Sequence, residues 1–291
     1  MRRRNGGRES GSLLKARRGR GKAVEVTPES AGWTYLDFAV VQLDADTSYA
    51  EESGHREVVV VPISGRGMAR VGRERIDLAR TGVFEELPHV LYVPPGRSIE
   101  VRADGDFTFT IGGAPAEGGL PLRMFEPAEM RVELRGGGAS YRQISHILSA
   151  PLPAERLILY EGHAPRGTWS GWAPHCHDGY AGSPYLEEVY YFRLQPATGF
   201  ALHRNWREDT DFDEVMVCED GDTALVPRGF HSTVACPGTN MYFLNYLAGE
   251  PVGDERARGP YFHPDHTWIH DGWDAGAMTL PTAGVEMARE R

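Results

Sequence analysis

The amino-acid sequence predicts an all-β protein in which two β-barrels follow one another in a single chain. Residues of high β-propensity come in short runs within a chain of 291 residues that is 41% hydrophobic. The 35 glycines and 20 prolines are frequent enough to place turns between these runs. Stretches with helical periodicity are scarce, and the first half echoes the second in its turns and strand spacing.

The first half is predicted to be a barrel without metal ligands. Residues 1–22 are rich in arginine and glycine and lack an apolar segment, so we expect a flexible basic tail and no secretory signal. The barrel would occupy residues 23–122, and an unrelated β-sandwich is the alternative. A passage rich in glycine and proline at 112–121 is the candidate linker. The expected strands of this half lie at 33–43, 58–63, 68–71, 89–93, 98–101 and 107–111.

The second half, residues 123–291, is predicted to form a metal-binding barrel. Its strands alternate with turns that contain glycine or proline, such as the turn at 227–229. The segment 264–269 is polar and aromatic, and we expect it to pack back on the barrel. The expected strands lie at 130–134, 141–148, 157–160, 198–206, 221–226 and 241–249.

Composition restricts the partners of this chain. A net charge of −10 argues against nucleic acid, because affinity for phosphate depends largely on lysine and arginine. No run of 18 or more apolar residues exists, so we expect no membrane span. Cys176, Cys218 and Cys236 cannot all pair within one chain, which fits a reducing cytoplasm. Exposed sheet edges often pair between subunits, so a homo-oligomer is expected.

A histidine pair in the second half is the first sign of a metal site. The stretch 174–178 reads Pro-His-Cys-His-Asp. In an extended strand, residues i and i+2 face the same side, so His175 and His177 would project together while Cys176 points away. An isolated pair of this kind is commonly two surface residues, and the neighbouring sequence therefore has to decide.

Two further residues complete the predicted site. Alternation in the following strand places Glu188, Tyr190 and Phe192 on one face. A carboxylate on an otherwise aromatic face needs a partner, because a buried unpaired charge is costly, and a metal ion would supply one. Downstream, a Pro-Arg-Gly turn leads to His231. Imidazole and carboxylate ligands suit a divalent ion such as Zn, Mn, Fe, Ni or Co better than Ca or Mg. The predicted ligands are His175, His177, Glu188 and His231.

These stretches resemble the paired motifs of the cupin superfamily, in which His-x-His, a following Glu and a later His converge inside a β-barrel. More closely, the chain resembles the 5-deoxy-glucuronate isomerase family of myo-inositol catabolism, whose members are bicupins with two barrels of the double-stranded β-helix type. Three positions depart from the family pattern, namely Cys176, Thr168 and His203. The matching signatures lie at 27–33, 169–178, 185–191, 219–231 and 244–249.

The resemblance implies an enzyme, an aldose-ketose isomerase that converts 5-deoxy-D-glucuronate to 5-dehydro-2-deoxy-D-gluconate. A divalent ion would polarise the carbonyl and stabilise the charge that develops when the neighbouring carbon loses its proton. Tyr190 is a candidate to hydrogen-bond the substrate, and no general base is assigned. Arginine is the best partner for the substrate carboxylate, so Arg204, Arg193 and Arg228 are candidates, with Arg142 a further contender.

Three other functions remain open at this point. The same ligand set serves iron-dependent cupin dioxygenases, which would consume O₂. An isomerase of 5-dehydro-4-deoxy-D-glucuronate from pectin breakdown is the nearest alternative in chemistry. A sugar-binding bicupin without catalysis is the third, although a binding module would not require four metal ligands.

Overall fold

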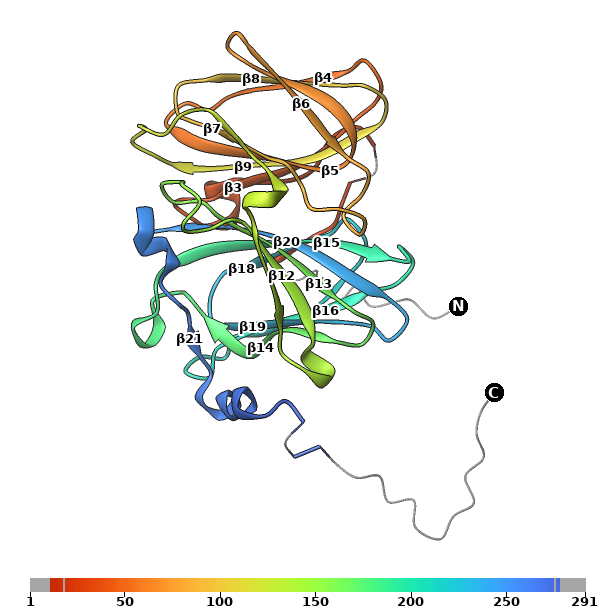
Figure 1. The fold of residues 1–291 in the computed structure, drawn as a ribbon. Helices are drawn as coiled ribbons and strands as arrows, with labels where there is room; N and C mark the ends of the chain where they lie inside the picture. The colour runs from red at the N-terminus through yellow and green to blue at the C-terminus, as the bar shows by residue number, and fades with distance from the viewer. Residues whose placement is uncertain (1–10, 18, 275, 278–291) are drawn as a thin grey trace, which may run out of the picture.

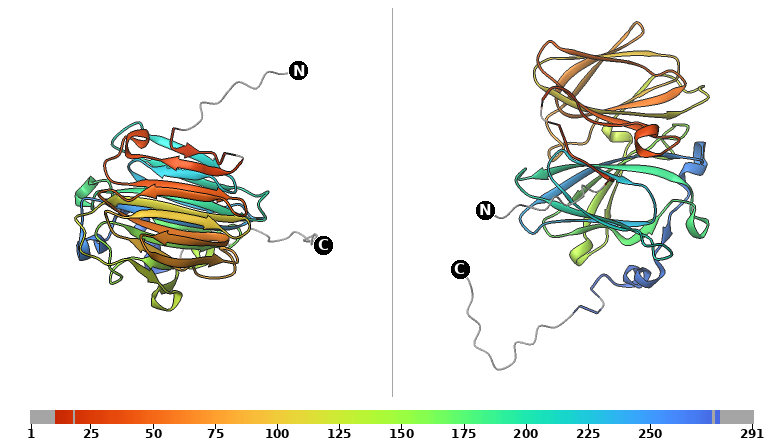
Figure 2. Two further views of the ribbon diagram at one scale, coloured as in Figure 1. Left: turned by 90° about the horizontal axis from the view of Figure 1, so that it is seen from above. Right: turned by 180° about the vertical axis from the view of Figure 1, so that it is seen from behind.

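The described residues, 11–17, 19–274 and 276–277, form three β-sheets in this computed structural model. Figure 1 shows two β-rich lobes stacked one on the other, and Figure 2 shows the same stack from above and from behind. The expected all-β class is confirmed, because the helices are short. They are α1 (Pro28–Ala31) and the 3-10 helices η1 (Pro127–Glu129), η2 (Gly138–Ser140), η3 (Tyr180–Gly182), η4 (Gly253–Ala257) and η5 (Pro264–Asp271).

The N-terminal lobe is a nine-stranded sheet that curls over on itself. Its longest strand pairs with two strands through its first half and with two others through its second half, so it belongs to both layers. Between the layers lie closely packed valine, leucine, isoleucine and phenylalanine side chains. The strands are β2 (Gly21–Val26), β3 (Asp37–Leu43), β4 (Ser48–Glu52), the long β5 (Arg56–Val71), β6 (Glu74–Arg80), β7 (Val90–Val93), β8 (Ser98–Ala103), β9 (Phe107–Pro115) and β10 (Arg123–Phe125).

The C-terminal lobe consists of two sheets that face one another. The seven-stranded sheet contains β1 (Leu13–Leu14), β11 (Arg131–Arg135), β12 (Arg142–Leu148), β13 (Ile158–Ala164), β15 (Leu186–Gln195), β18 (Thr223–Val226) and β20 (Asn240–Gly249). The five-stranded sheet contains β14 (Trp169–Cys176), β16 (Ala201–Trp206), β17 (Asp213–Cys218), β19 (Phe230–Ala235) and β21 (Tyr261–Phe262). Phe192 and Phe243 of the first sheet share one apolar cluster with Met216 and Cys218 of the second.

The nine-stranded and seven-stranded sheets pack face to face across an apolar layer. Phe38 meets Tyr246 edge-on with ring centroids 5.1 Å apart, and the Tyr246 hydroxyl donates to the carbonyl oxygen of Val59 at 3.2 Å. A Cβ atom at Gly112 would lie 2.9 Å from the Tyr246 ring. The prediction of a linker over 112–121 is therefore wrong for its first four residues, which belong to β9. Gly112 is needed in this strand because the missing side chain leaves space for the Tyr246 ring of the other lobe.

Buried polar contacts also join the lobes. Arg80 of β6 and Glu161 of β13 form an ion pair at 2.7 Å with both side chains fully buried, and the Tyr242 hydroxyl donates to the same carboxylate at 2.7 Å. Glu187 accepts backbone hydrogen bonds from residues 34–36, and Glu57 accepts them from residues 155–157. These carboxylates fix how one lobe sits on the other.

The ends of the chain differ in part from expectation. Residues 1–10 of the predicted tail lie outside the described residues, but Leu13 and Leu14 form β1, which pairs with β18, and Lys15 forms an ion pair with Asp222 at 2.7 Å. The predicted division after residue 122 precedes β10, which still pairs with β7 of the N-terminal lobe. The expectation for 264–269 is confirmed, since η5 packs on β14. Among the described residues, no helix has the length and apolar character needed to cross a membrane.

Candidate metal centre

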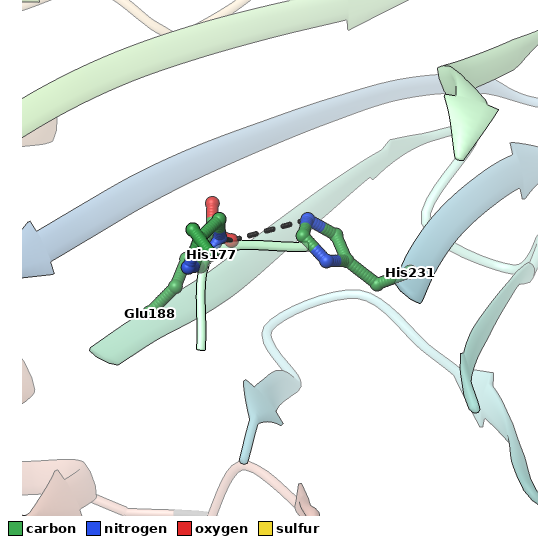
Figure 3. A group of neighbouring side chains, drawn as sticks. All are labelled: His177, Glu188 and His231. Atoms are coloured by element: carbon green, nitrogen blue, oxygen red, sulfur yellow. Dashed lines mark hydrogen bonds and ion pairs between the residues drawn. The ribbon is translucent and has the colours of Figure 1, made fainter. Parts of the chain in front are cut away.

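Three of the four predicted ligands meet inside the C-terminal lobe. His177, Glu188 and His231 each offer a ligand atom, and these atoms lie within 4.8 Å of one another (Figure 3). All three side chains are buried. They come from the two facing sheets, because Glu188 lies on β15 of the seven-stranded sheet and His231 lies on β19 of the five-stranded sheet. The site therefore spans the interior of the lobe.

Local hydrogen bonds hold the segments that carry the two histidines. The Asp178 carboxylate accepts from the backbone N–H of Gly229 and from Arg207, both at 2.7 Å, which ties the loop after His177 to the turn before His231. Gly229 has φ +81°, and a Cβ atom there would lie 2.2 Å from the Trp206 carbonyl oxygen. Only glycine fits this turn, which delivers His231 to the interior.

Hydrogen bonds orient His177 and keep Glu188 ionised. Nδ1 of His177 donates to the Leu186 carbonyl oxygen at 2.8 Å, which leaves Nε2 facing Glu188 at 2.9 Å. Burial alone would raise the pKa of Glu188, but the hydrogen bond from His177 and the proximity of His231 hold it well below the usual value. A backbone partner on the outer nitrogen is the usual way in which a metal-binding histidine is oriented.

The imidazole rings of His175 and His231 have buried nitrogens that form no hydrogen bond with the described residues. Nε2 of His231 lies 3.2 Å from Glu188, yet neither ring nitrogen of His231 has a hydrogen-bond partner among the described residues. Nδ1 of His175 is also buried without a partner, and its ring lies 4.4 Å from that of His231. Buried polar atoms normally find partners. A divalent cation among these nitrogens and the Glu188 carboxylate would satisfy them, so the residues fit a metal ion.

The two members of the His-x-His pair have different positions. Both line the same cavity, as alternation predicts, while Cys176 packs with Trp206 and Phe230 on the opposite side. The His175 ring centroid lies 6.2 Å from that of His177, and His175 stands outside the close group of three. Its role as fourth ligand therefore remains a prediction.

A cavity of about 310 Å³ opens beside the metal centre. His175, His177, Glu188 and Tyr190 all line it. The Tyr190 ring lies 5.8 Å from that of His231, and Phe192 joins the same interior, so the predicted face of this strand is confirmed. Burial and then the charge of Glu188 raise the pKa of Tyr190, so its hydroxyl keeps its proton at neutral pH.

His203 lies behind the metal centre. Its ring is stacked on that of His231 with centroids 6.1 Å apart, and its Nε2 lies 3.0 Å from Oδ1 of Asn205. Burial and the neighbouring His231 lower the pKa of His203 to about 3, so it is neutral at neutral pH. It does not line the cavity, and its place against His231 is that of a support.

The three arginines predicted to bind substrate lie outside the cavity. Arg204 is on the outer face of β16, where it pairs with Asp213 at 2.7 Å. Arg193 pairs with Asp220 at 2.9 Å. Arg228 is exposed over the Phe212 ring, with its guanidinium 4.6 Å from the centroid. The physical reason is strand alternation: on β16, Arg204 stands between two buried residues that face inward and must itself face out.

Other arginines line the cavity instead, and sequence reasoning missed most of them. Of these, only Arg142 stood among the earlier contenders. A signal was available, because Arg142, Ile144 and His146 alternate along β12 and all line the cavity. The arginines of the cavity wall are Arg131, Arg135, Arg142, Arg256 and Arg258.

Known proteins with similar sequences cover most of this chain. The chain is 38% identical over 254 residues to a 5-deoxy-glucuronate isomerase of Geobacillus thermodenitrificans, covering 86% of this chain and 91% of the relative. It is 30% identical over 251 residues to a 5-deoxy-glucuronate isomerase of Bacillus subtilis strain 168, covering 84% and 91%.

Solved structures agree with this similarity. An IolB-like protein of Salmonella typhimurium superposes with a TM-score of 0.85 at 31% identity, covering 90% of this chain and all of that one. An oxalate decarboxylase of Lactobacillus farciminis shares the fold alone, with a TM-score of 0.61 at 11% identity and 92% of each chain covered. The model of the KduI/IolB family matches residues 12–269. Since this match takes in both lobes and the metal centre, the chain belongs to the KduI/IolB family.

Proposed function

We propose that this protein is the metal-dependent aldose-ketose isomerase that converts 5-deoxy-D-glucuronate to 5-dehydro-2-deoxy-D-gluconate in myo-inositol degradation. The observation that carries the proposal is a buried cluster of His177, Glu188 and His231 on the wall of a cavity, in a chain of the KduI/IolB family. Relatives that are 30 to 38% identical carry the name 5-deoxy-glucuronate isomerase.

The metal ion would be held by His177, Glu188 and His231, with His175 as fourth ligand. Their nitrogen and oxygen donors suit Zn, Mn, Fe, Ni or Co. When bound, the ion would supply Lewis-acid polarisation of the sugar carbonyl. The ionised Glu188 and the oriented Nε2 of His177 prepare the site for a cation, because both are already directed inward.

Residues of the cavity wall would bind and orient the sugar. Tyr190 keeps its hydroxyl proton and can donate a hydrogen bond to a substrate oxygen close to His231. Of the residues that the structure describes, several arginines and one carboxylate, Glu188, line the cavity, which suits a sugar that carries a negative charge. A volume of about 310 Å³ is that of a small-molecule site.

The test is a comparison of substrates with the metal-loaded enzyme. Purified protein would be analysed for bound metal and assayed with 5-deoxy-D-glucuronate and with 5-dehydro-4-deoxy-D-glucuronate, while O₂ uptake is recorded. We expect conversion of the first uronate without O₂ consumption, and loss of turnover after chelation that is restored by a divalent ion. Preference for the second uronate, or O₂ uptake, would replace the proposal with one of its alternatives.

A pair of alanine variants tests the ligand assignment. His177→Ala should lose both bound metal and turnover, because its Nε2 faces Glu188 directly. His175→Ala should lower metal affinity as well if it is the fourth ligand. Metal content and turnover equal to wild type in the His175 variant would leave a three-residue site.

We also propose that the two lobes are a pair of cupin barrels and that the protein is a cytoplasmic homo-oligomer. In support of the first point, the lobes have similar layering and the oxalate decarboxylase superposes over both. In support of the second, the edge strand β11 exposes Val132 and Leu134, with Leu134 65% exposed. Light scattering after gel filtration would test the oligomer, and a monomeric mass would contradict it.

A further inference from the structure

Arg142 of the cavity wall is buried without an acidic partner among the residues that the structure describes. The Arg142 side chain is only 7% exposed. Its two terminal nitrogens donate to the carbonyl oxygens of Ser140 at 2.9 Å and Trp172 at 3.1 Å, and its Nε has no hydrogen-bond partner in residues 11–17, 19–274 and 276–277. Within the part of the chain that the structure describes, no carboxylate forms an ion pair with it. A buried charge in this state is costly unless a ligand compensates it.

A second positive charge lies directly across the sheet. Arg135 of β11 is in register with Arg142 of β12, and both line the cavity. Like charges at opposed positions of neighbouring strands destabilise a sheet. Arg135 is partly compensated by the Glu133 carboxylate at 2.6 Å, whereas the contacts of Arg142 are with two backbone carbonyls and with the Trp273 ring, whose centroid lies 5.9 Å from the guanidinium. Burial and the charge of Arg135 lower the pKa of Arg142 to about 10, and it therefore remains a cation at neutral pH.

The position of this pair relates it to the metal centre. The Arg142 guanidinium is bound to the carbonyl of Trp172, three residues before His175 on β14. Both Arg142 and His175 line the same cavity, so a small molecule within it is in reach of an anion-binding group and of the metal centre. Arg256 of η4 is also buried on the cavity wall, and its terminal nitrogens likewise donate to backbone carbonyls, but it lies outside the paired strands β11 and β12 that place Arg135 opposite Arg142.

We propose that Arg142, assisted by Arg135, binds the carboxylate of the sugar acid and so makes the site specific for uronates over neutral sugars. This inference rests on the proposed function for the identity of the substrate. A guanidinium fork matches a carboxylate in charge and geometry, and the free Nε–H of Arg142 is a donor that the fold leaves for it. The carboxylate also removes the repulsion between the two arginines.

The experiment compares a uronate with its primary amide, which has the same shape without the charge. Wild type should prefer 5-deoxy-D-glucuronate over 5-deoxy-D-glucuronamide. Arg142→Gln should lower kcat/KM for the uronate at least about tenfold, mainly through KM, and should abolish the preference. Metal content should stay at the wild-type level. Arg142→Lys should keep part of the preference, because charge remains while the fork is lost. Arg70→Gln, an exposed arginine of the other lobe that pairs with Glu100, is the matched control.

Binding measurements separate this inference from the proposed function. Calorimetry with D-glucuronate and D-glucose would use wild type and both Arg142 variants. If wild type converts no uronate but binds D-glucuronate in an Arg142-dependent manner, the function fails and the inference stands. If Arg142→Gln keeps the wild-type preference for uronate over amide, the inference is overturned while the function stands. Should Arg142→Gln not fold, Arg142→Lys and Arg135→Gln carry the test, and an undiminished preference in both overturns it.

Discussion

The two lobes show how similar layers of strands serve different ends. Between its layers, the N-terminal lobe packs apolar residues such as Phe107, Phe109 and Val101 against one another. The C-terminal lobe has an apolar cluster around Phe192 and Phe243, but histidines, a glutamate and arginines occupy the neighbouring part of its interior. Among the described residues, the group of His177, Glu188 and His231 is the one that could hold a metal ion.

The difference indicates a division of labour. An interior filled with apolar side chains is stabilised by their burial. A polar cavity gives up part of this stabilisation, and each buried charge in its wall costs free energy unless it has a partner. The two lobes share an apolar layer and the Arg80–Glu161 ion pair, so the stable lobe can support the functional one.

The largest effect is expected at the metal centre. Glu188→Gln removes the one carboxylate of the cluster and the charge that attracts a cation. We expect loss of bound metal and a fall in turnover greater than the roughly 10- to 100-fold that is typical when only an outer partner of a ligand is lost. Elemental analysis and the isomerase assay check this. Normal metal content in this variant would contradict the site.

A substitution in the N-terminal lobe should affect stability without affecting chemistry. Phe109 is fully buried between the layers of that lobe. Phe109→Ala should lower the free energy of unfolding by about 3–5 kcal/mol, through lost burial and a cavity. Urea unfolding measures this, and kcat/KM per folded molecule should remain that of wild type. A change in metal affinity would indicate that the lobes are less separate than described.

Loss of one partner of the Arg80–Glu161 ion pair between the lobes should lower stability, because the other partner is left as an uncompensated buried charge. Arg80→Met leaves the buried Glu161 without its cation and should cost about 3–5 kcal/mol. The double variant Arg80→Met/Glu161→Met should be less destabilised than Arg80→Met alone, since no buried charge is left. Equal or greater loss in the double variant would show that the attraction itself, rather than the uncompensated charge, dominates.

The cavity wall should make stability depend on pH. Burial, with the charges of Arg131 and Arg135, lowers the pKa of His146 to about 4 from its usual value of 6.5. Between these two pH values the unfolded chain binds a proton that the folded chain does not, so stability falls as pH drops through this window. In His146→Gln, the free energy of unfolding should fall less from pH 7 to pH 4. Parallel curves for variant and wild type would rule this out.

The smallest effect is expected at an arginine of the outer surface. Arg204→Gln breaks an ion pair with Asp213. The pair is exposed, because 44% of the Arg204 side chain and 54% of the Asp213 side chain are accessible to solvent. Exposed pairs of this kind contribute roughly 0–1 kcal/mol. We expect the free energy of unfolding to change by about that amount, and KM to change less than about twofold in steady-state kinetics because Arg204 does not line the cavity. A larger increase in KM would return Arg204 to the list of substrate-binding residues.

Prediction from sequence succeeded where a feature depends on neighbours along the chain. Alternation correctly placed Glu188, Tyr190 and Phe192 on one face and turned Cys176 away from His175 and His177. It did not find the arginines of β11 and β12, although the same rule, applied to Arg142 and His146, shows that they share a face. The sequence did not show which face of β12 is turned toward the interior of the lobe and which toward solvent.

The sequence by itself determined that the chain would be β-structured, which side chains share a strand face and which residues have metal-binding chemistry. The tertiary structure alone decided which faces turn inward, because that depends on contacts between strands far apart in sequence. His231 reaches Glu188 only because two sheets face one another. Arg142 lies unpaired beside them only because β12 forms part of the cavity wall. Such distances follow from packing and cannot be read from spacing along the chain.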